Sequence, residues 1–139
     1  MPKVVIDTSV FIAALLSKSQ TSTPNQVLQA WRQGKFTLVM APQLLQELVA
    51  RLLYLKVRDR TIEDLVVIIA EISLHISGAY EATKLDKIDP DDNKFLAAIY
   101  ESKADYLISL DNHLLSLKYY HGTQILTPHL FLTALSSLS

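Results

Sequence analysis

The sequence contains no cysteine among its 139 residues, and it has only three glycines and one tryptophan. The absence of cysteine excludes a disulfide-stabilised scaffold, a cysteine-ligated zinc site and catalysis by a cysteine nucleophile. Hydrophobic residues make up 50% of the chain, which is enough to bury a core of ordinary size. These features predict a single domain over residues 1–139.

The sequence also lacks a long hydrophobic run. No stretch reaches the roughly 18 consecutive apolar residues that a membrane-spanning helix needs. The apolar run near the N-terminus is short, contains Asp7 and has no cleavage motif, so we do not expect a signal peptide. We therefore predict a cytoplasmic protein without a membrane anchor.

Charge of one sign is not in excess, because the net charge is −1. The strongly basic balance that marks many nucleic-acid binders is therefore missing. If several acidic residues are gathered in one metal site, bound cations offset their negative charge. The rest of the chain then carries a net positive charge that the average hides. The average charge thus does not exclude a nucleic-acid substrate.

Strand-like and helix-like segments alternate along the chain. Buried-strand patterns cover residues 3–7, 35–41, 104–111 and 122–128, and helical periodicity covers 9–16, 25–33, 43–55, 61–73, 92–103, 112–117 and 129–138. Thr23 is the expected N-cap of the second helix, and Thr61 with Asp64 resembles a capping box. Residues 74–88 fit either a short strand or an extended connector. The alternation predicts an α/β fold with a mainly parallel sheet.

Asp7 and Asp111 each end a predicted strand and precede a helix. Ligands in such folds bind beyond the carboxyl ends of the strands, so both carboxylates should face one crevice. Either aspartate can instead cap the helix that follows it. Thr8 or Ser9 can cap the first of these helices as well. Two acids at equivalent strand ends favour a functional site more than one acid would.

The stretch DPDDNKFLAAI, residues 89–99, places Asp89, Asp91 and Asp92 directly before a helix. Helix capping and the macrodipole explain one or two of these acids. Three carboxylates this close repel one another, and a cation relieves that repulsion. Hard oxygen ligands suit Mg²⁺ or Mn²⁺. One or two such ions can activate water and stabilise the leaving oxygen of a phosphodiester.

Glu47 is a fourth candidate acid, and its local pattern is ambiguous. Helical periodicity places it on the polar side of the helix at 43–55. Arg51 follows four residues later, in the order that favours an ion pair on a helix surface. Local pattern alone therefore favours a solvated pair between these two side chains.

Four segments together resemble the acidic signature of PIN-domain ribonucleases: DTSVF at 7–11, Glu47 after PQLLQ, DPDDNKFLAA at 89–98 and ADYLISLDNHLL at 104–115. Their order and spacing match over nearly the whole chain, and they are most similar to VapC-like toxins of bacterial toxin–antitoxin pairs. The resemblance implies a three-layer α/β/α fold with a central, mainly parallel sheet. It also implies an endoribonuclease that hydrolyses RNA with Mg²⁺ or Mn²⁺ and is neutralised by a cognate antitoxin protein.

Carried over by position, the resemblance assigns metal binding and catalysis to Asp7, Glu47, Asp92 and Asp111. It assigns supporting polar roles to Thr8 or Ser9, to Asn93 and to Ser109. The local pattern leaves Asp89 as either a supporting polar group or a solvated one. Asn93 is also the alternative for the third acid position when the helices are aligned without a gap. One departure is Leu110, which stands where the family often has glycine.

RNA contacts and protein partners are less well defined by the sequence. Lys94 and Arg51 are the candidate phosphate contacts. His113 can touch RNA or metal, although a surface histidine is the more common case. Tyr119 and Tyr120 can stack on bases or pack in a core. The apolar helices at 42–55 and 61–73 offer surfaces for an antitoxin or for a homodimer.

The main alternative is a non-catalytic PIN-like module that binds RNA or protein. A haloacid-dehalogenase-type phosphatase is disfavoured because Ser9 stands where a second aspartate is needed. A response-regulator receiver is disfavoured because Asp7 is not part of an acid pair. RNA is preferred over DNA on the resemblance alone.

Overall fold

The computed structural model describes residues 1–138, and their strands form one mixed sheet. The strands are β1 (Lys3–Ile6), β2 (Thr37–Met40), β3 (Ser73–His75), β4 (Tyr106–Ile108), β5 (Tyr119–Tyr120) and β6 (Thr123–Leu126). Their order is β3-β2-β1-β4-β6-β5, and every pairing is parallel except that between β5 and β6. The predicted mainly parallel sheet is confirmed.

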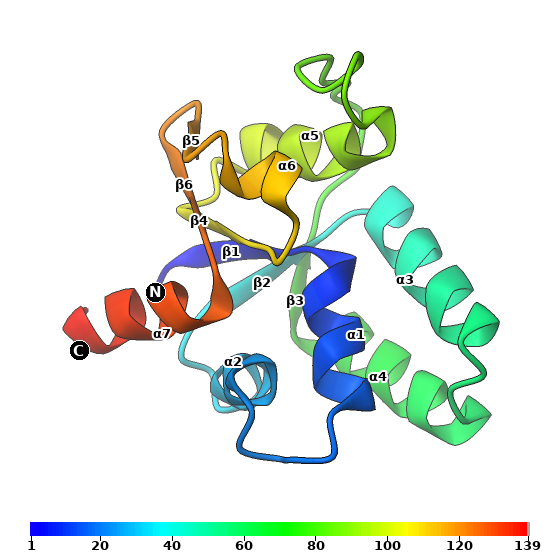
Figure 1. Ribbon diagram of the computed structural model, residues 1–139. Coiled ribbons are helices and arrows are strands. Elements are labelled where there is room, and N and C mark those ends of the chain that lie inside the picture. The colour runs from blue at the N-terminus through cyan, green and yellow to red at the C-terminus, as the bar shows by residue number, and fades with distance from the viewer. Residues whose placement is uncertain (139) are drawn as a thin grey trace.

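Helices cover both faces of this sheet, which gives three layers (Figure 1). They are α1 (Thr8–Leu16), α2 (Thr23–Arg32), α3 (Pro42–Tyr54), α4 (Asp59–Ile72), α5 (Asn93–Ser102), α6 (Asn112–Leu115) and α7 (Pro128–Ser137), with a short 3-10 turn, η1, at Pro90–Asp92. In Figure 1, α5 lies above the sheet, and α1, α2 and α7 lie below it. The predicted α/β/α architecture is confirmed. No helix among residues 1–138 has the length and apolar character needed to cross a membrane.

The central strands are apolar on both faces because both faces are covered. Val4 and Val5 of β1 are fully buried although they point to opposite sides of the sheet, and Leu38 and Val39 of β2 behave in the same way. Continuous apolar runs of this kind are typical of buried parallel strands. The polar residues that directly follow β1 and β4 are also buried, so they stand out against the apolar strands before them.

Two predicted helix caps are wrong. The N-cap of α2 is Ser22, whose side chain accepts a hydrogen bond from the backbone N–H of Asn25, so Thr23 is already helical. Helix α4 begins at Asp59, two residues before the predicted capping pair, and Asp64 bonds with Arg60 instead. A capping motif is local, and helices extend past it when the preceding residues can take helical angles.

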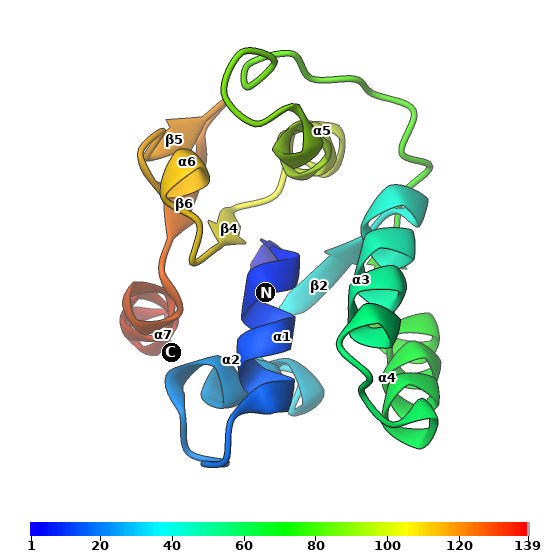
Figure 2. The ribbon, with the colours of Figure 1, turned by 45° about the vertical axis from the view of Figure 1, so that its right-hand side comes forward.

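Residues 74–88, which were expected to form either a short strand or an extended connector, contain parts of both. Ser73, predicted as the last helical residue, begins β3, which pairs with β2 at the sheet edge. The chain then crosses from β3 to the start of α5 (Figure 2). Glu101 of α5 holds this connector, because its carboxylate accepts hydrogen bonds from Ser77 Oγ and from the N–H groups of Gly78 and Tyr80. The short strand β5 was not predicted, since two residues carry no periodicity.

Replacing Gly78 with alanine should destabilise the fold. Gly78 has a φ of +74°, and an added Cβ would meet the side-chain amide of Gln43, which now donates to the Gly78 carbonyl at 2.7 Å. We expect the free energy of unfolding to fall by about 1–2 kcal/mol in urea titration. Gly34→Ala is the matched control, because Gly34 has a φ of +75° with nothing within 4 Å of a Cβ. Equal losses in both variants would contradict a role for the contact with Gln43.

Candidate metal centre

The carboxyl ends of β1 and β4 bring two acids to the same edge of the sheet. These strands are neighbours, with Ile6 opposite Ile108, and the N–H of Asp7 donates to the Ile108 carbonyl at 2.9 Å. Asp7 follows β1 directly, and Asp111 follows β4 after two residues. The structure therefore places both acids beyond the strand ends, where ligands bind in α/β folds.

Asp7 is buried and surrounded by hydroxyl groups. Its Oδ2 accepts hydrogen bonds from Ser9 Oγ at 3.0 Å and Ser109 Oγ at 2.6 Å, and its Oδ1 accepts from the Ser9 N–H at 3.3 Å. Burial raises the pKa of Asp7 above its ordinary value, and the nearby Asp111 adds to this, although the hydrogen bonds act in the opposite direction. Asp7 thus caps α1 and also presents a carboxylate at the sheet edge.

The two serines tie the loops after β1 and β4 together. Ser109 Oγ accepts a hydrogen bond from the Asp111 N–H at 2.9 Å while it donates to Asp7. Ser9 Oγ accepts from the Leu110 N–H at 3.3 Å while it donates to Asp7. Both serines therefore fix the positions of the acids.

Asp92 projects from η1 into this region rather than capping α5. It is 8% exposed, its side chain makes no cap hydrogen bond, and its Oδ2 is buried without a hydrogen-bond partner among residues 1–138. Burial raises the pKa of Asp92 to about 8, with further contributions from Asp111, Asp89 and Asp7. The capping interpretation fails for Asp92, whose carboxylate lies near those of Asp89 and Asp111 instead.

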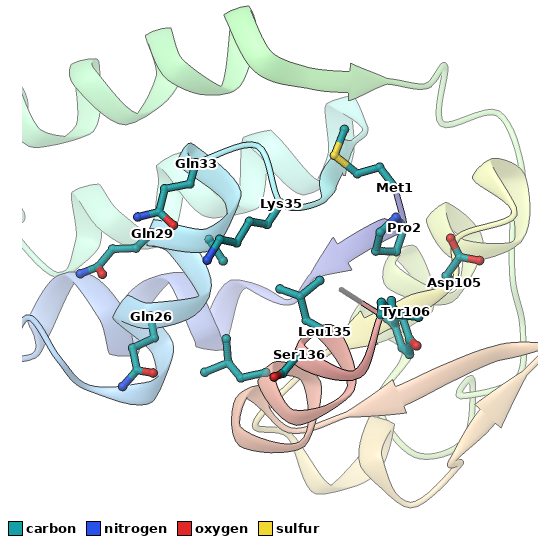
Figure 3. Close-up of a pocket in the computed structure, with 13 residues that line it drawn as sticks. Met1, Pro2, Gln26, Gln29, Gln33, Lys35, Asp105, Tyr106, Leu135 and Ser136 are labelled. Atoms are coloured by element: carbon teal, nitrogen blue, oxygen red, sulfur yellow. The ribbon is translucent and has the colours of Figure 1, made fainter.

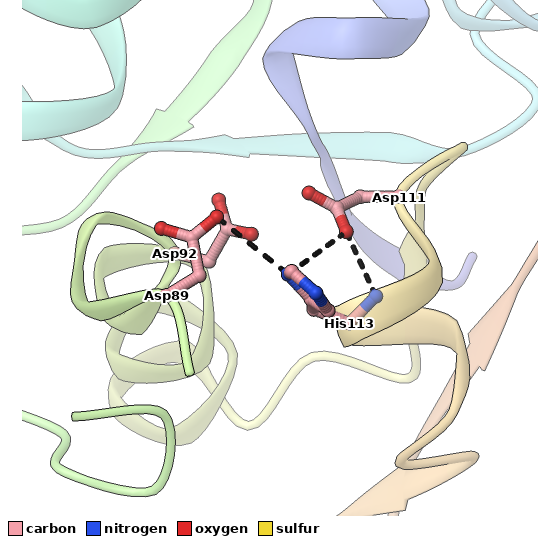
Figure 4. Close-up of side chains that lie close together, drawn as sticks. All are labelled: Asp89, Asp92, Asp111 and His113. Atoms are coloured by element: carbon pink, nitrogen blue, oxygen red, sulfur yellow. Dashed lines mark hydrogen bonds and ion pairs between the residues drawn. The ribbon is translucent and has the colours of Figure 1, made fainter. Parts of the chain in front are cut away.

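A compact group of possible ligands forms between η1 and α6. Asp89, Asp92, Asp111 and His113 each offer one ligand atom, and these atoms all lie within 4.8 Å of one another (Figure 4). Asp111 caps α6 by accepting from the His113 N–H at 2.8 Å. From the sequence, Asp89 was expected to have only a supporting role, and His113 was expected to lie on the surface. Folding brings both residues to the acids, because α6 turns back toward the start of α5.

Glu47 lies elsewhere and does not pair with Arg51 as its helix pattern predicted. Its carboxylate accepts a hydrogen bond from Thr8 Oγ1 at 2.5 Å and forms an ion pair with Lys94 Nζ at 2.9 Å. These partners come from α1 and α5, which a helical wheel of α3 cannot include. Glu47 is not in the four-residue group, but it bonds to Thr8, the residue that follows Asp7. Arg51 is exposed on α3.

Asn93 and Lys94 bond to residues outside the group of four possible ligands. Asn93 accepts from the Leu85 N–H at 2.9 Å and donates to Asp86 at 2.7 Å, so it holds the connector. Lys94 pairs with Glu47 and donates to the Asp91 carbonyl. Asp92 and Asn93 were the two candidates for the third acid position. Of these two, Asp92 is the residue that lies in the group with the other acids.

The donor set fits a divalent cation. Among residues 1–138, no lysine or arginine nitrogen forms an ion pair within 4.0 Å with the carboxylates of Asp7, Asp89, Asp92 or Asp111. Grouped carboxylates without a cationic partner are costly. The unpartnered Oδ2 of Asp92 is the atom that a cation would satisfy. Oxygen-rich sets of this kind suit Mg²⁺ or Mn²⁺.

A groove lies at the opposite end of the strands. It has a volume of about 1100 Å³ and runs between α2 and α7 (Figure 3). Lys35 and Asp105, which precede β2 and β4, line it together with Gln29 and Leu135. Because it opens at the amino ends of the parallel strands, this groove is separate from the acids at their carboxyl ends.

The fold agrees with what comparison with known proteins shows. The family model for the PIN domain matches residues 3–113, and the chain belongs to this family. The matched range includes all the acids described above and His113. The predicted resemblance to PIN-domain proteins is confirmed.

Two further relatives support this placement. The uncharacterized protein MJ1680 of Methanocaldococcus jannaschii is 32% identical over 121 residues, which cover 84% of this chain and 75% of the relative. A chain in the crystal structure of VapBC2 from Rickettsia felis, bound to a DNA fragment from its promoter, matches with a TM-score of 0.61. That match covers 88% of this chain and 96% of the other at 12% identity, so it shows a shared fold.

Proposed function

We propose that this chain is a single-domain, metal-dependent endoribonuclease that hydrolyses RNA phosphodiester bonds. The observation that carries the proposal is the grouping of Asp92 and Asp111, whose ligand atoms lie within 4.8 Å of each other beyond the carboxyl edge of the sheet. Ser109 joins Asp7 to the backbone of Asp111, and one buried carboxylate oxygen of Asp92 has no hydrogen-bond partner among the described residues. Membership of the PIN-domain family supports a nuclease over other uses of an acidic site.

Asp92, Asp111 and Asp7 would hold one or two Mg²⁺ or Mn²⁺ ions. When bound, such an ion lowers the pKa of water and stabilises negative charge on phosphoryl oxygens. Ser9 and Ser109 keep Asp7 oriented through the hydrogen bonds described above. These contacts fix the first acid without a lysine or arginine, so its negative charge remains available to a cation.

Glu47 and Lys94 would organise the side of the site nearest α3. The ion pair at 2.9 Å holds the Glu47 carboxylate against Thr8, one residue from Asp7. In this arrangement Glu47 acts on the site as a positioning residue or through a water molecule. Lys94 and Arg51 are the proposed contacts to the RNA backbone, with Lys94 leaving Glu47 as phosphate approaches.

We further propose that the nuclease is the toxin of a toxin–antitoxin pair and works in the cytoplasm. The shared fold with a chain of VapBC2 supports an antitoxin protein as partner. Large apolar side chains are exposed on α3 and α4, including Leu53, Tyr54 and Val67. These side chains provide a surface for the antitoxin or for a homodimer.

Metal removal tests the activity directly. Purified protein is incubated with a mixed pool of labelled RNAs in Mg²⁺, in Mn²⁺ and in EDTA. We expect cleavage with either ion and at least about a 1000-fold loss in EDTA, because a phosphodiesterase of this type has no side-chain nucleophile to replace the cation. Cleavage that resists EDTA would contradict the proposal. Absence of both cleavage and Mn²⁺ binding would favour the non-catalytic RNA- or protein-binding module.

A further inference from the structure

The imidazole of His113 faces the carboxylates across the gap between α6 and η1. Its Nδ1 lies 3.8 Å from Asp89 Oδ2 and 3.8 Å from Asp111 Oδ1 (Figure 4). Asp92 belongs to the same group, within which one ligand atom of each residue lies within 4.8 Å of the others. A nitrogen donor therefore stands among three carboxylates.

These separations suit a shared cation better than direct contacts. A hydrogen bond between an imidazole and a carboxylate has a length of about 2.7–2.9 Å, well below 3.8 Å. Two donors that bind one ion at about 2.1 Å each lie about 3.0 Å apart when adjacent and about 4.2 Å apart when opposite. The distances from Nδ1 to Asp89 and to Asp111 fall within that range.

An independent observation points to a ligand at the same place. Asp92 is 8% exposed, and its Oδ2 has no hydrogen-bond partner among the described residues. A buried carboxylate oxygen without a partner is costly, because it has lost water and gained nothing in return. A cation held by the four side chains would satisfy this atom.

We infer that His113 and Asp89 bind the cation together with Asp92 and Asp111, and that this nitrogen-containing set prefers Mn²⁺ to Mg²⁺. Mg²⁺ binds oxygen ligands and keeps much of its water, whereas imidazole nitrogen is a ligand suited to transition-metal ions. The inference rests on the proposed function for its catalytic meaning only. Cation binding itself can be measured without RNA.

Pulsed electron paramagnetic resonance of the Mn²⁺-loaded protein tests the inference. We expect the wild-type spectrum to contain the modulation of a directly bound nitrogen, and His113→Ala to lose it. We also expect His113→Ala to weaken Mn²⁺ binding by about 10- to 100-fold while changing Mg²⁺ binding much less. The side chain of His113 is 52% exposed, so its removal should leave the thermal unfolding of the metal-free protein unchanged.

Matched variants separate ligand loss from general effects. His129 is an exposed histidine on α7, below the sheet, and His129→Ala should retain the nitrogen signal. Asp89→Asn should weaken Mn²⁺ binding, whereas Asp91→Asn should not, because Asp91 is exposed and lies outside the group.

The outcomes distinguish this inference from the proposed function. Mn²⁺ bound without nitrogen modulation in wild type would overturn the role of His113 and leave a carboxylate-only nuclease intact. An unchanged preference for Mn²⁺ over Mg²⁺ in His113→Ala would contradict the inference that His113 causes this preference. Nitrogen modulation in a protein that cleaves no RNA with any ion would support the inference and contradict the proposed function.

Discussion

Replacing Asp7 with asparagine is expected to abolish RNA cleavage while leaving the fold intact. The loss should be about 1000-fold or more, as for other residues whose removal disables a catalytic centre. Asparagine has the same shape, and its amide oxygen can still accept from the Ser9 N–H. Its amide nitrogen can donate to the hydroxyls of Ser9 and Ser109 once these rotate. What is lost is the negative charge that would bind a cation.

Cleavage rates measured with Mg²⁺ and Mn²⁺, together with circular dichroism, check this prediction. Asp91→Asn is the matched control, because it removes an exposed acid from the turn that carries Asp92 without touching the buried carboxylates. We expect the control to retain wild-type rates. Equal activity of Asp7→Asn and wild type would place the reaction elsewhere or identify a contaminating nuclease.

The position of the first and last acids is predictable from the sequence because strand direction determines it. An apolar run that ends in an acid places that acid at the carboxyl edge of a parallel sheet, and Asp7 and Asp111 follow this rule. The alternative that each aspartate caps a helix is also correct, since Asp7 accepts from Ser9 and Asp111 accepts from His113. Capping and a site at the strand ends are therefore compatible.

The partners of Glu47 and the neighbours of His113 are not predictable in the same way. Helical periodicity describes one helix, so it pairs Glu47 with Arg51, whereas the observed contacts come from α1 and α5. His113 reaches Asp89 only because α6 is a four-residue helix that turns toward η1. Such contacts depend on how loops close in three dimensions, and residue spacing along the chain does not specify this.

The second large effect is expected at the buried Asp92. Its replacement by asparagine should stabilise the metal-free protein while it slows RNA cleavage. The pKa of Asp92 is raised to about 8 in the folded protein, from an ordinary value of 3.8. The folded state therefore holds a proton that the unfolded state releases between these pH values. Stability must fall as pH rises through this window, and the full cost is present above pH 8. Asp92→Asn removes this cost together with the charge.

We expect Asp92→Asn to stabilise the metal-free protein by about 2 kcal/mol at pH 8, which is roughly 6 °C in melting temperature. This figure is below the full conversion of the pKa difference, because Asp89 and Asp111 are only half-buried and solvent screens the site. The gain should shrink at pH 5, where the wild-type side chain is protonated in the folded state. Thermal unfolding in EDTA at both pH values measures it.

Addition of Mn²⁺ should make the wild-type protein more stable than Asp92→Asn, which reverses their order of stability in EDTA. A cation that binds only the folded state stabilises wild type in proportion to the logarithm of its concentration. Asp92→Asn, which lacks the charge, should gain little and should cleave RNA at least about 100-fold more slowly. A gain of equal size at pH 5 and pH 8 would show that it does not arise from the ionisation of Asp92. Equal stabilisation of both proteins by Mn²⁺ would show that Asp92 is not a ligand of the cation. As a ligand, the ionised carboxylate of Asp92 destabilises the metal-free protein and also binds the cation, so its loss must weaken the stabilisation by Mn²⁺.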